Sequence, residues 1–155
     1  MLTWLNFSVA IAATVTPVDR YADVKDVMLA TSACLDSTST KQARTDVPLK
    51  FDFTSANDPT GPLFKKAHSS AIIRFNPDQD GVQRTCTVYS EIAISNEVVL
   101  RSVVTNVYKS QQTKQSDSTI WLFQRRGMQG LQMFSETRGD RLSLKIIAAT
   151  FVEPK

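Results

Sequence analysis

The sequence is poor in the residues that interrupt regular structure or carry chemistry. Its 155 residues include only 5 glycines, 6 prolines, 2 cysteines and 1 histidine. So few glycines and prolines exclude a collagen-like or low-complexity chain. A share of 42% hydrophobic and 21% charged residues excludes an intrinsically disordered one. Because a chain of this length can bury a core of its own, the composition predicts one globular domain.

Several function classes are disfavoured because their signals are missing. Neither the glycine-rich dinucleotide fingerprint nor the P-loop pattern occurs. The net charge is only +3, and the closest basic groupings are the pairs Lys65-Lys66 and Arg125-Arg126. Nucleic-acid-binding proteins concentrate such charges on one face, so we expect no nucleic-acid partner. No apolar run reaches the roughly 20 residues of a membrane-spanning helix, so we expect no transmembrane segment.

The N-terminus carries an uncharged, mostly apolar run, LTWLNFSVAIAATV, at residues 2–15. The run resembles the apolar core of a secretory signal peptide, with small residues at Ala10, Ala12 and Ala13 where cleavage would occur. Unlike most signal peptides, it has no Lys or Arg before it. Residues 1–13 are therefore either a signal peptide or an apolar segment that packs on the domain at 14–155. The first alternative predicts a periplasmic or secreted protein and the second a cytoplasmic one.

The two cysteines, Cys34 and Cys86, stand too far apart for a redox or zinc motif. In an oxidising compartment they would form one disulfide that closes a long loop. The alternative is two buried thiols that pack as small hydrophobic side chains. We expect the disulfide, because the N-terminal run also points to export.

Apolar periodicity predicts an α+β fold in the order α-β-β-α-β-β-β, with two helices packed on one antiparallel sheet. The first helix is expected to start at Thr16-Pro17, an N-cap followed by a first-turn proline, and to end near Leu35. A polar loop follows, and Phe51–Phe53 alternates like a short edge strand. The strands at 71–75 and 82–89 read as a hairpin, joined by the turn-like sequence NPDQDG.

The second half of the chain predicts a helix and a meander. Asn96–Lys109 has apolar residues at helical spacing, with Ser95 as the expected N-cap. Valine favours strands, but the spacing of the apolar residues is the stronger indication, and it predicts a helix. We expect this helix to lie across the sheet. After a polar linker come three expected strands: 120–124, 131–137 and 142–148. The expected buried stripe of the helix is Val99, Leu100, Val103, Val104, Val107 and Tyr108.

The single histidine, His68, is the one candidate general base. Ser69, Ser70 or another serine could act as the nucleophile of a hydrolase. However, the chain has no nucleophile elbow of the G-x-S-x-G type. A surface histidine is the simpler interpretation, so we predict no catalytic residue.

Two further segments resemble binding sites. Asn76-x-Asp78-x-Asp80-Gly81 has the spacing of a calcium loop, but its twelfth position is Thr87 where a bidentate Glu is needed. We therefore expect a polar hairpin turn and no metal. Trp121 lies within the expected strand 120–124, and Arg125 directly follows that strand, where a guanidinium can hold an anion. They are the candidate ligand-binding residues.

The missing catalytic and cofactor motifs favour a non-enzymatic interaction or accessory domain with a protein partner and no cofactor. A bacterial envelope or secreted setting fits the N-terminal run. One alternative is a small-ligand or anion-binding domain that uses Trp121 and Arg125. The other is a hydrolase that uses His68.

Overall fold

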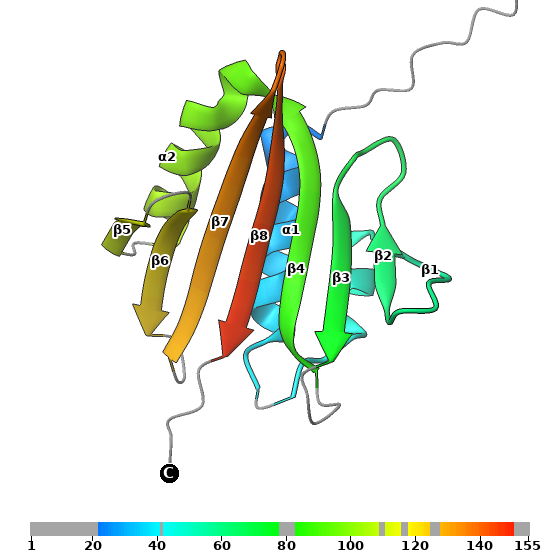
Figure 1. Cartoon of the computed structure of the whole chain (residues 1–155). Coiled ribbons are helices and arrows are strands. Elements are labelled where there is room, and N and C mark those ends of the chain that lie inside the picture. The colour runs from blue at the N-terminus through cyan, green and yellow to red at the C-terminus, as the bar shows by residue number, and fades with distance from the viewer. Residues whose placement is uncertain are drawn as a thin grey trace, which may run out of the picture.

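A computed structural model describes residues 22–40, 42–77, 83–108, 111–115, 118–124 and 128–150. Within these ranges one eight-stranded antiparallel sheet carries two α-helices on the same face (Figure 1). The opposite face of the sheet is not covered by any described helix. The expected α+β fold, with two helices on one antiparallel sheet, is therefore confirmed.

The elements follow the chain from a first helix to a final meander. Their bounds are α1 Val24–Ser37, η1 Val47–Phe51, β1 Thr54–Ala56, β2 Leu63–Lys65, β3 Ile72–Pro77, β4 Gln83–Ala93, η2 Ile94–Asn96, α2 Glu97–Tyr108, β5 Gln111–Gln115, β6 Ser118–Gln124, β7 Met128–Arg138 and β8 Arg141–Thr150. Across the sheet the order is β1-β2-β3-β4-β8-β7-β6-β5. The last strand, β8, thus lies between β4 and β7 and joins the expected hairpin to the expected meander.

Three strands were not predicted as the structure has them. The edge strand expected at Phe51–Phe53 was placed wrongly: Phe51 ends the 3-10 helix η1 and Asp52 turns the chain with a left-handed φ of 62°, so the edge strand β1 begins only at Thr54. β2 is a three-residue strand beside it. The polar segment expected as a linker contains β5, which pairs with β6 at the other edge of the sheet.

The helix α1 begins later than the sequence suggested. Its N-cap is Asp23, whose carboxylate accepts a hydrogen bond from the Asp26 backbone N–H at 2.7 Å. The expected cap at Thr16-Pro17 lies outside the described residues. The buried face of α1 combines Val27 and Leu35 with small residues, of which Ala30 and Ala33 are fully buried. Such residues let the helix approach the strands closely.

The expected disulfide is present and joins α1 to β4. Cys34 and Cys86 are bonded, their Cα atoms lie 5.2 Å apart, and both side chains are completely buried. Around them, the inward residues of the strands alternate with outward ones, as expected for a sheet covered on one face. The core residues of the strands are Phe64, Ile73, Phe75, Cys86, Val88, Ile92, Leu131, Met133, Leu142, Leu144, Ile146 and Ala148.

The helix α2 confirms the predicted periodicity but not the whole predicted stripe. Leu100 and Val104 are fully buried in the core, whereas Val99 and Val107 are 50% and 57% exposed. Val99 lies at one margin of the apolar arc, and Val107 lies in the last turn of α2, so neither side chain reaches the core. Ser95, the expected N-cap, lies instead within η2.

A polar contact fixes α2 against the sheet. The guanidinium of Arg101 donates hydrogen bonds to the Thr119 hydroxyl on β6 at 2.6 Å and to the Ser135 hydroxyl on β7 at 3.2 Å. It also pairs with Glu97 one turn earlier, at 2.9 Å. Because the guanidinium is largely buried and hydrogen-bonded to both strands, Arg101 sets the position of the helix over β6 and β7.

Candidate functional site

The open face of the sheet places three large side chains in one cross-strand row. In the backbone register Lys145 of β8 is paired with Tyr89 of β4 on one side and with Phe134 of β7 on the other. Directly paired residues of adjacent strands lie on the same face. Their neighbours in sequence, Val88, Leu144 and Met133, are buried toward the helices. The row is therefore the outward counterpart of the core.

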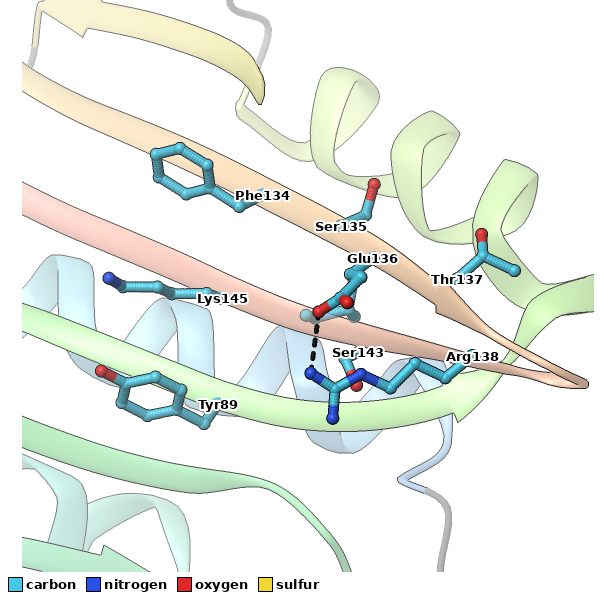
Figure 2. A pocket seen from close by; sticks show the side chains of 9 residues that line it. Tyr89, Phe134, Ser135, Glu136, Thr137, Arg138, Ser143 and Lys145 are labelled. Carbon is cyan, nitrogen blue, oxygen red and sulfur yellow. Dashed lines mark hydrogen bonds and ion pairs between the residues drawn. The ribbon is translucent and has the colours of Figure 1, made fainter. Parts of the chain in front are cut away.

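An open depression of about 750 Å³ covers this part of the face. Figure 2 shows Lys145 extended between the rings of Tyr89 and Phe134, with Glu136 and Arg138 farther along β7. Ser135 and Thr137 point instead toward α2. The lining residues are Tyr89, Phe134, Ser135, Glu136, Thr137, Arg138, Ser143, Leu144 and Lys145.

The charges at one end of the depression neutralise each other. Arg138 pairs with Glu136 at 2.8 Å, and the hydrogen bond and charge of that carboxylate raise the pKa of the Arg138 guanidinium. Arg141 pairs with Glu91 at 3.5 Å on the next strands. Solvent screens such exposed pairs, so each contributes little to stability.

Lys145 differs from these charges because no carboxylate within the described ranges pairs with it. Its ammonium lies 5.9 Å from the centre of the Phe134 ring, within the range of a cation–π contact. The face thus combines two partly accessible aromatic rings with one cation that is free to receive an anion. Tyr89 is 36% exposed.

The geometry fits a docking surface better than a small-molecule site. A ligand pocket encloses most of its ligand in a deep cavity with a few convergent polar groups. This depression is broad, spans three strands and is lined by rings, one lysine and paired charges. Exposed aromatic residues surrounded by polar ones are typical of protein interfaces.

The predicted ligand-binding residues are only partly described. Trp121 lies on β6, where its backbone pairs with Gln112 of β5 and Leu131 of β7. Its side chain and the whole of Arg125 lie outside the described part of the chain. The anion site expected there therefore stays a prediction.

His68 lies on an exposed turn between β2 and β3, with a left-handed φ of 58°. No hydrogen bond joins it to another residue in the described ranges. The hydroxyl of Ser70 donates to the Glu91 carbonyl and accepts from the backbone N–H groups of Ala22 and Glu91. It thereby links three segments of backbone and is not poised as a nucleophile. Ser69 caps its own turn by accepting from the Ala71 N–H.

The described residues contain no cluster of three side chains suited to bind a metal ion. Asn76 lies at the end of β3, and Asp78 and Asp80 of the calcium-like sequence lie outside the described residues.

A second exposed apolar group lies on the outer side of α2. Val98 and Val99 in the first turn are 77% and 50% exposed, and Ile94, just before the helix, is 42% exposed. Isolated surface valines need no explanation, but neighbouring ones form a patch that a partner could cover. This patch lies on the helix side of the sheet, away from Tyr89 and Lys145.

Sequence reasoning did not identify Tyr89, Phe134 or Lys145. Each alternates with buried residues along its strand, which marks it only as outward-facing. Their proximity depends on β8 pairing with both β4 and β7, which are distant in sequence. The sequence offered one signal for these residues: a Tyr and a Phe occupy positions that alternate with apolar core residues and therefore face outward.

No family model, curated protein or solved structure matches this chain. Of the helices described, neither is both long and apolar enough to cross a membrane.

Proposed function

We propose that the chain is a non-enzymatic interaction domain that binds a partner protein through the open face of its sheet. The observation that carries this proposal is the row Tyr89–Lys145–Phe134 in a broad depression, on the face away from both helices. Aromatic residues contribute strongly to protein interfaces because they bury large areas with little loss of side-chain freedom.

Site-specific photo-crosslinking tests this proposal in the cells that make the protein. A benzoylphenylalanine replaces Tyr89 in one variant and Lys25, an exposed residue of α1, in the control. We expect a discrete protein adduct from position 89 that is absent from position 25 and is lost when Phe134 is changed to serine. The same adducts from both positions, or none from position 89, would contradict the proposal.

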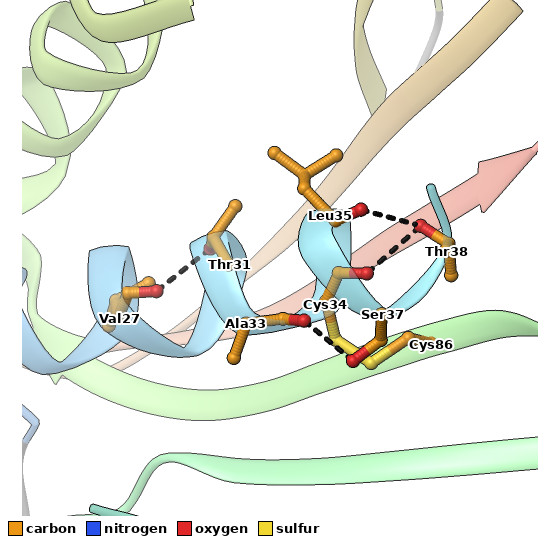
Figure 3. The surroundings of a disulfide bond; sticks show 8 residues. All are labelled: Val27, Thr31, Ala33, Cys34, Leu35, Ser37, Thr38 and Cys86. Carbon is orange, nitrogen blue, oxygen red and sulfur yellow. Dashed lines mark hydrogen bonds between the residues drawn. A yellow bond between two sulfur atoms is a disulfide. The ribbon is translucent and has the colours of Figure 1, made fainter. Parts of the chain in front are cut away.

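We also propose that the domain works in an oxidising compartment, as a periplasmic or secreted protein. The buried Cys34–Cys86 bond supports this setting, because disulfides persist mainly outside the reducing cytosol. Figure 3 shows the bond between the last turn of α1 and β4, beside the Ser37 hydroxyl, which donates to the Ala33 carbonyl at 2.7 Å. No solvent reaches either cysteine in the folded state.

Mass spectrometry of the intact protein, with and without thiol alkylation, tests whether the chain is exported to an oxidising compartment. The protein is expressed with its own N-terminus. We expect no alkylated cysteine and the loss of about twelve residues, as signal-peptide cleavage requires. A full-length chain with two alkylated cysteines after unfolding would contradict both the export and the disulfide.

The hydrolase alternative has less support. A general base must lie within hydrogen-bond distance of the group it activates. His68 is exposed, and the two serines beside it are occupied by backbone hydrogen bonds.

A further inference from the structure

We infer that the open face recognises a peptide segment in which a carboxylate stands beside an aromatic or aliphatic side chain, with Lys145 as the residue that receives the carboxylate. The inference rests on the proposed function, since it assumes that this face binds a partner protein. It adds the chemistry of the partner and the residue that selects it.

The first step is the position of Lys145. The register pairs it with Tyr89 and Phe134, so both rings lie beside its aliphatic stem. The ring of Phe134 also lies 5.9 Å from the ammonium. In Figure 2 the ammonium of Lys145 and the hydroxyl of Tyr89 point to the same side of the depression. An oxygen bound there could accept from both groups.

The second step is the charge balance of the face. Glu136 and Glu91 are the nearest carboxylates along β7 and β4, and each pairs with an arginine. Lys145 has no such partner among the described residues. A partner carboxylate can therefore pair with Lys145 without breaking an existing ion pair. A partner ammonium would meet an unpaired positive charge, which disfavours it.

The third step is the apolar environment of Lys145. A carboxylate alone gains little at an exposed lysine, because water screens the pair. An apolar group next to the carboxylate would cover the Tyr89 and Phe134 rings and displace water from the ammonium. Partial exclusion of water strengthens the attraction between the charges. The rings and the lysine thus favour an acid that is attached to an apolar neighbour over a free anion.

Selection of a random heptapeptide phage library on the full chain tests the inference. The chains compared are the wild type, Lys145→Met, Lys25→Met and the double variant Tyr89→Ser/Phe134→Ser. Lys145→Met retains the aliphatic stem and removes the charge. Lys25→Met removes an exposed lysine from α1 instead. Thermal melts identify any variant that fails to fold.

We expect the wild type and Lys25→Met to enrich peptides with Asp or Glu beside an apolar residue. The corresponding synthetic peptide should bind Lys145→Met about tenfold more weakly, as expected for the loss of one charge-assisted hydrogen bond. Its glutamine or asparagine analogue should lose affinity for the wild type to a similar extent. Sodium acetate should displace the peptide only far above the peptide's own dissociation constant.

Different failures separate the inference from the proposed function. Peptides that bind the folded aromatic double variant as well as the wild type would contradict the open face as the binding surface. Peptides that need the rings but show no acidic preference, or bind Lys145→Met equally well, would contradict the role of Lys145 alone. Displacement by acetate at concentrations similar to the peptide's would identify a small anion as the ligand and also overturn the inference.

Discussion

The carboxylate of Asp58 fixes the turn between β1 and β2 onto β3. It accepts hydrogen bonds from the Thr60 hydroxyl and, at 2.8 Å, from the Thr60 backbone N–H, and it pairs with Arg74 at 2.6 Å. These contacts, the Thr60 hydroxyl first, hold the pKa of Asp58 below its usual 3.8. A carboxylate with a depressed pKa stabilises the fold above its unfolded-state pKa. That contribution is lost as the pH falls through the folded-state pKa.

We therefore expect Asp58→Asn to melt at a lower temperature than the wild type at pH 7, with the difference shrinking as the pH falls below 3.8. Thermal melts across this pH range measure it. Asp36→Asn is the matched control, because Asp36 is exposed and its carboxylate has no described contact. A difference for Asp58→Asn that is the same at every pH would show that the carboxylate's charge is not responsible.

The left-handed backbone at His68 gives a second prediction at this scale. Glycine adopts a φ of 58° without steric cost. His68→Gly should therefore change the free energy of unfolding by less than about 1 kcal/mol, because relief of backbone strain offsets the added freedom of the unfolded chain. Denaturant titration measures this change. A loss of several kcal/mol would reveal contacts of the imidazole that the described residues do not provide.

At the scale of elements, α2 carries both a buried and an exposed valine, so the same substitution can be compared at the two positions. Val104 is 0% exposed and Val98 is 77% exposed. Val104→Asp should destabilise the domain by more than about 3 kcal/mol, because it buries an unpaired charge in the core. Val98→Asp should stay within about 0.5 kcal/mol, as surface changes do. Circular-dichroism melts of the two variants compare them, and equal losses would mean that α2 is oriented differently.

The second prediction at the scale of elements concerns the disulfide, which joins α1 to β4. The two cysteines are separated by 52 residues. In the chain-entropy account, closing such a loop stabilises the fold by about 4 kcal/mol. We expect Cys34→Ala/Cys86→Ala to lower the free energy of unfolding by a similar amount, measured by urea titration against the oxidised wild type. An unchanged midpoint would indicate that the wild-type cysteines are not bonded.

The elements that could be predicted were those in which apolar residues recur with a clear period over a long segment. Asn96–Lys109 was predicted as a helix although it is rich in valine, because its apolar residues do not alternate. β5 could not be predicted in the same way. Its sequence, QQTKQ, has no apolar alternation, and it is a strand because β6 offers a free edge to pair with. The start of α1 was misplaced because Thr16-Pro17, which lies outside the described residues, carries the stronger N-terminal signal, whereas the N-cap of α1 is Asp23.

At the scale of the whole molecule, the binding face depends on topology. The sequence predicts which residues of β4, β7 and β8 point outward, but not that β8 lies between the other two. Long-range pairing of strands is not encoded in any local pattern, so the row of Tyr89, Lys145 and Phe134 could not be foreseen. For the same reason the sequence suggested Trp121 and Arg125, which are close in the chain, as the binding residues.

Backbone amide chemical shifts of the ¹⁵N-labelled chain, recorded with and without the library-selected peptide, test the central claim most directly. They report at once on both candidate surfaces, the open face of the sheet and the outer side of α2. We predict that the largest changes lie around Tyr89, Phe134 and Lys145, and that Val98 and Val99 are unaffected. The largest changes on α2, with the three strands unchanged, would contradict the claim that the open face is the binding surface.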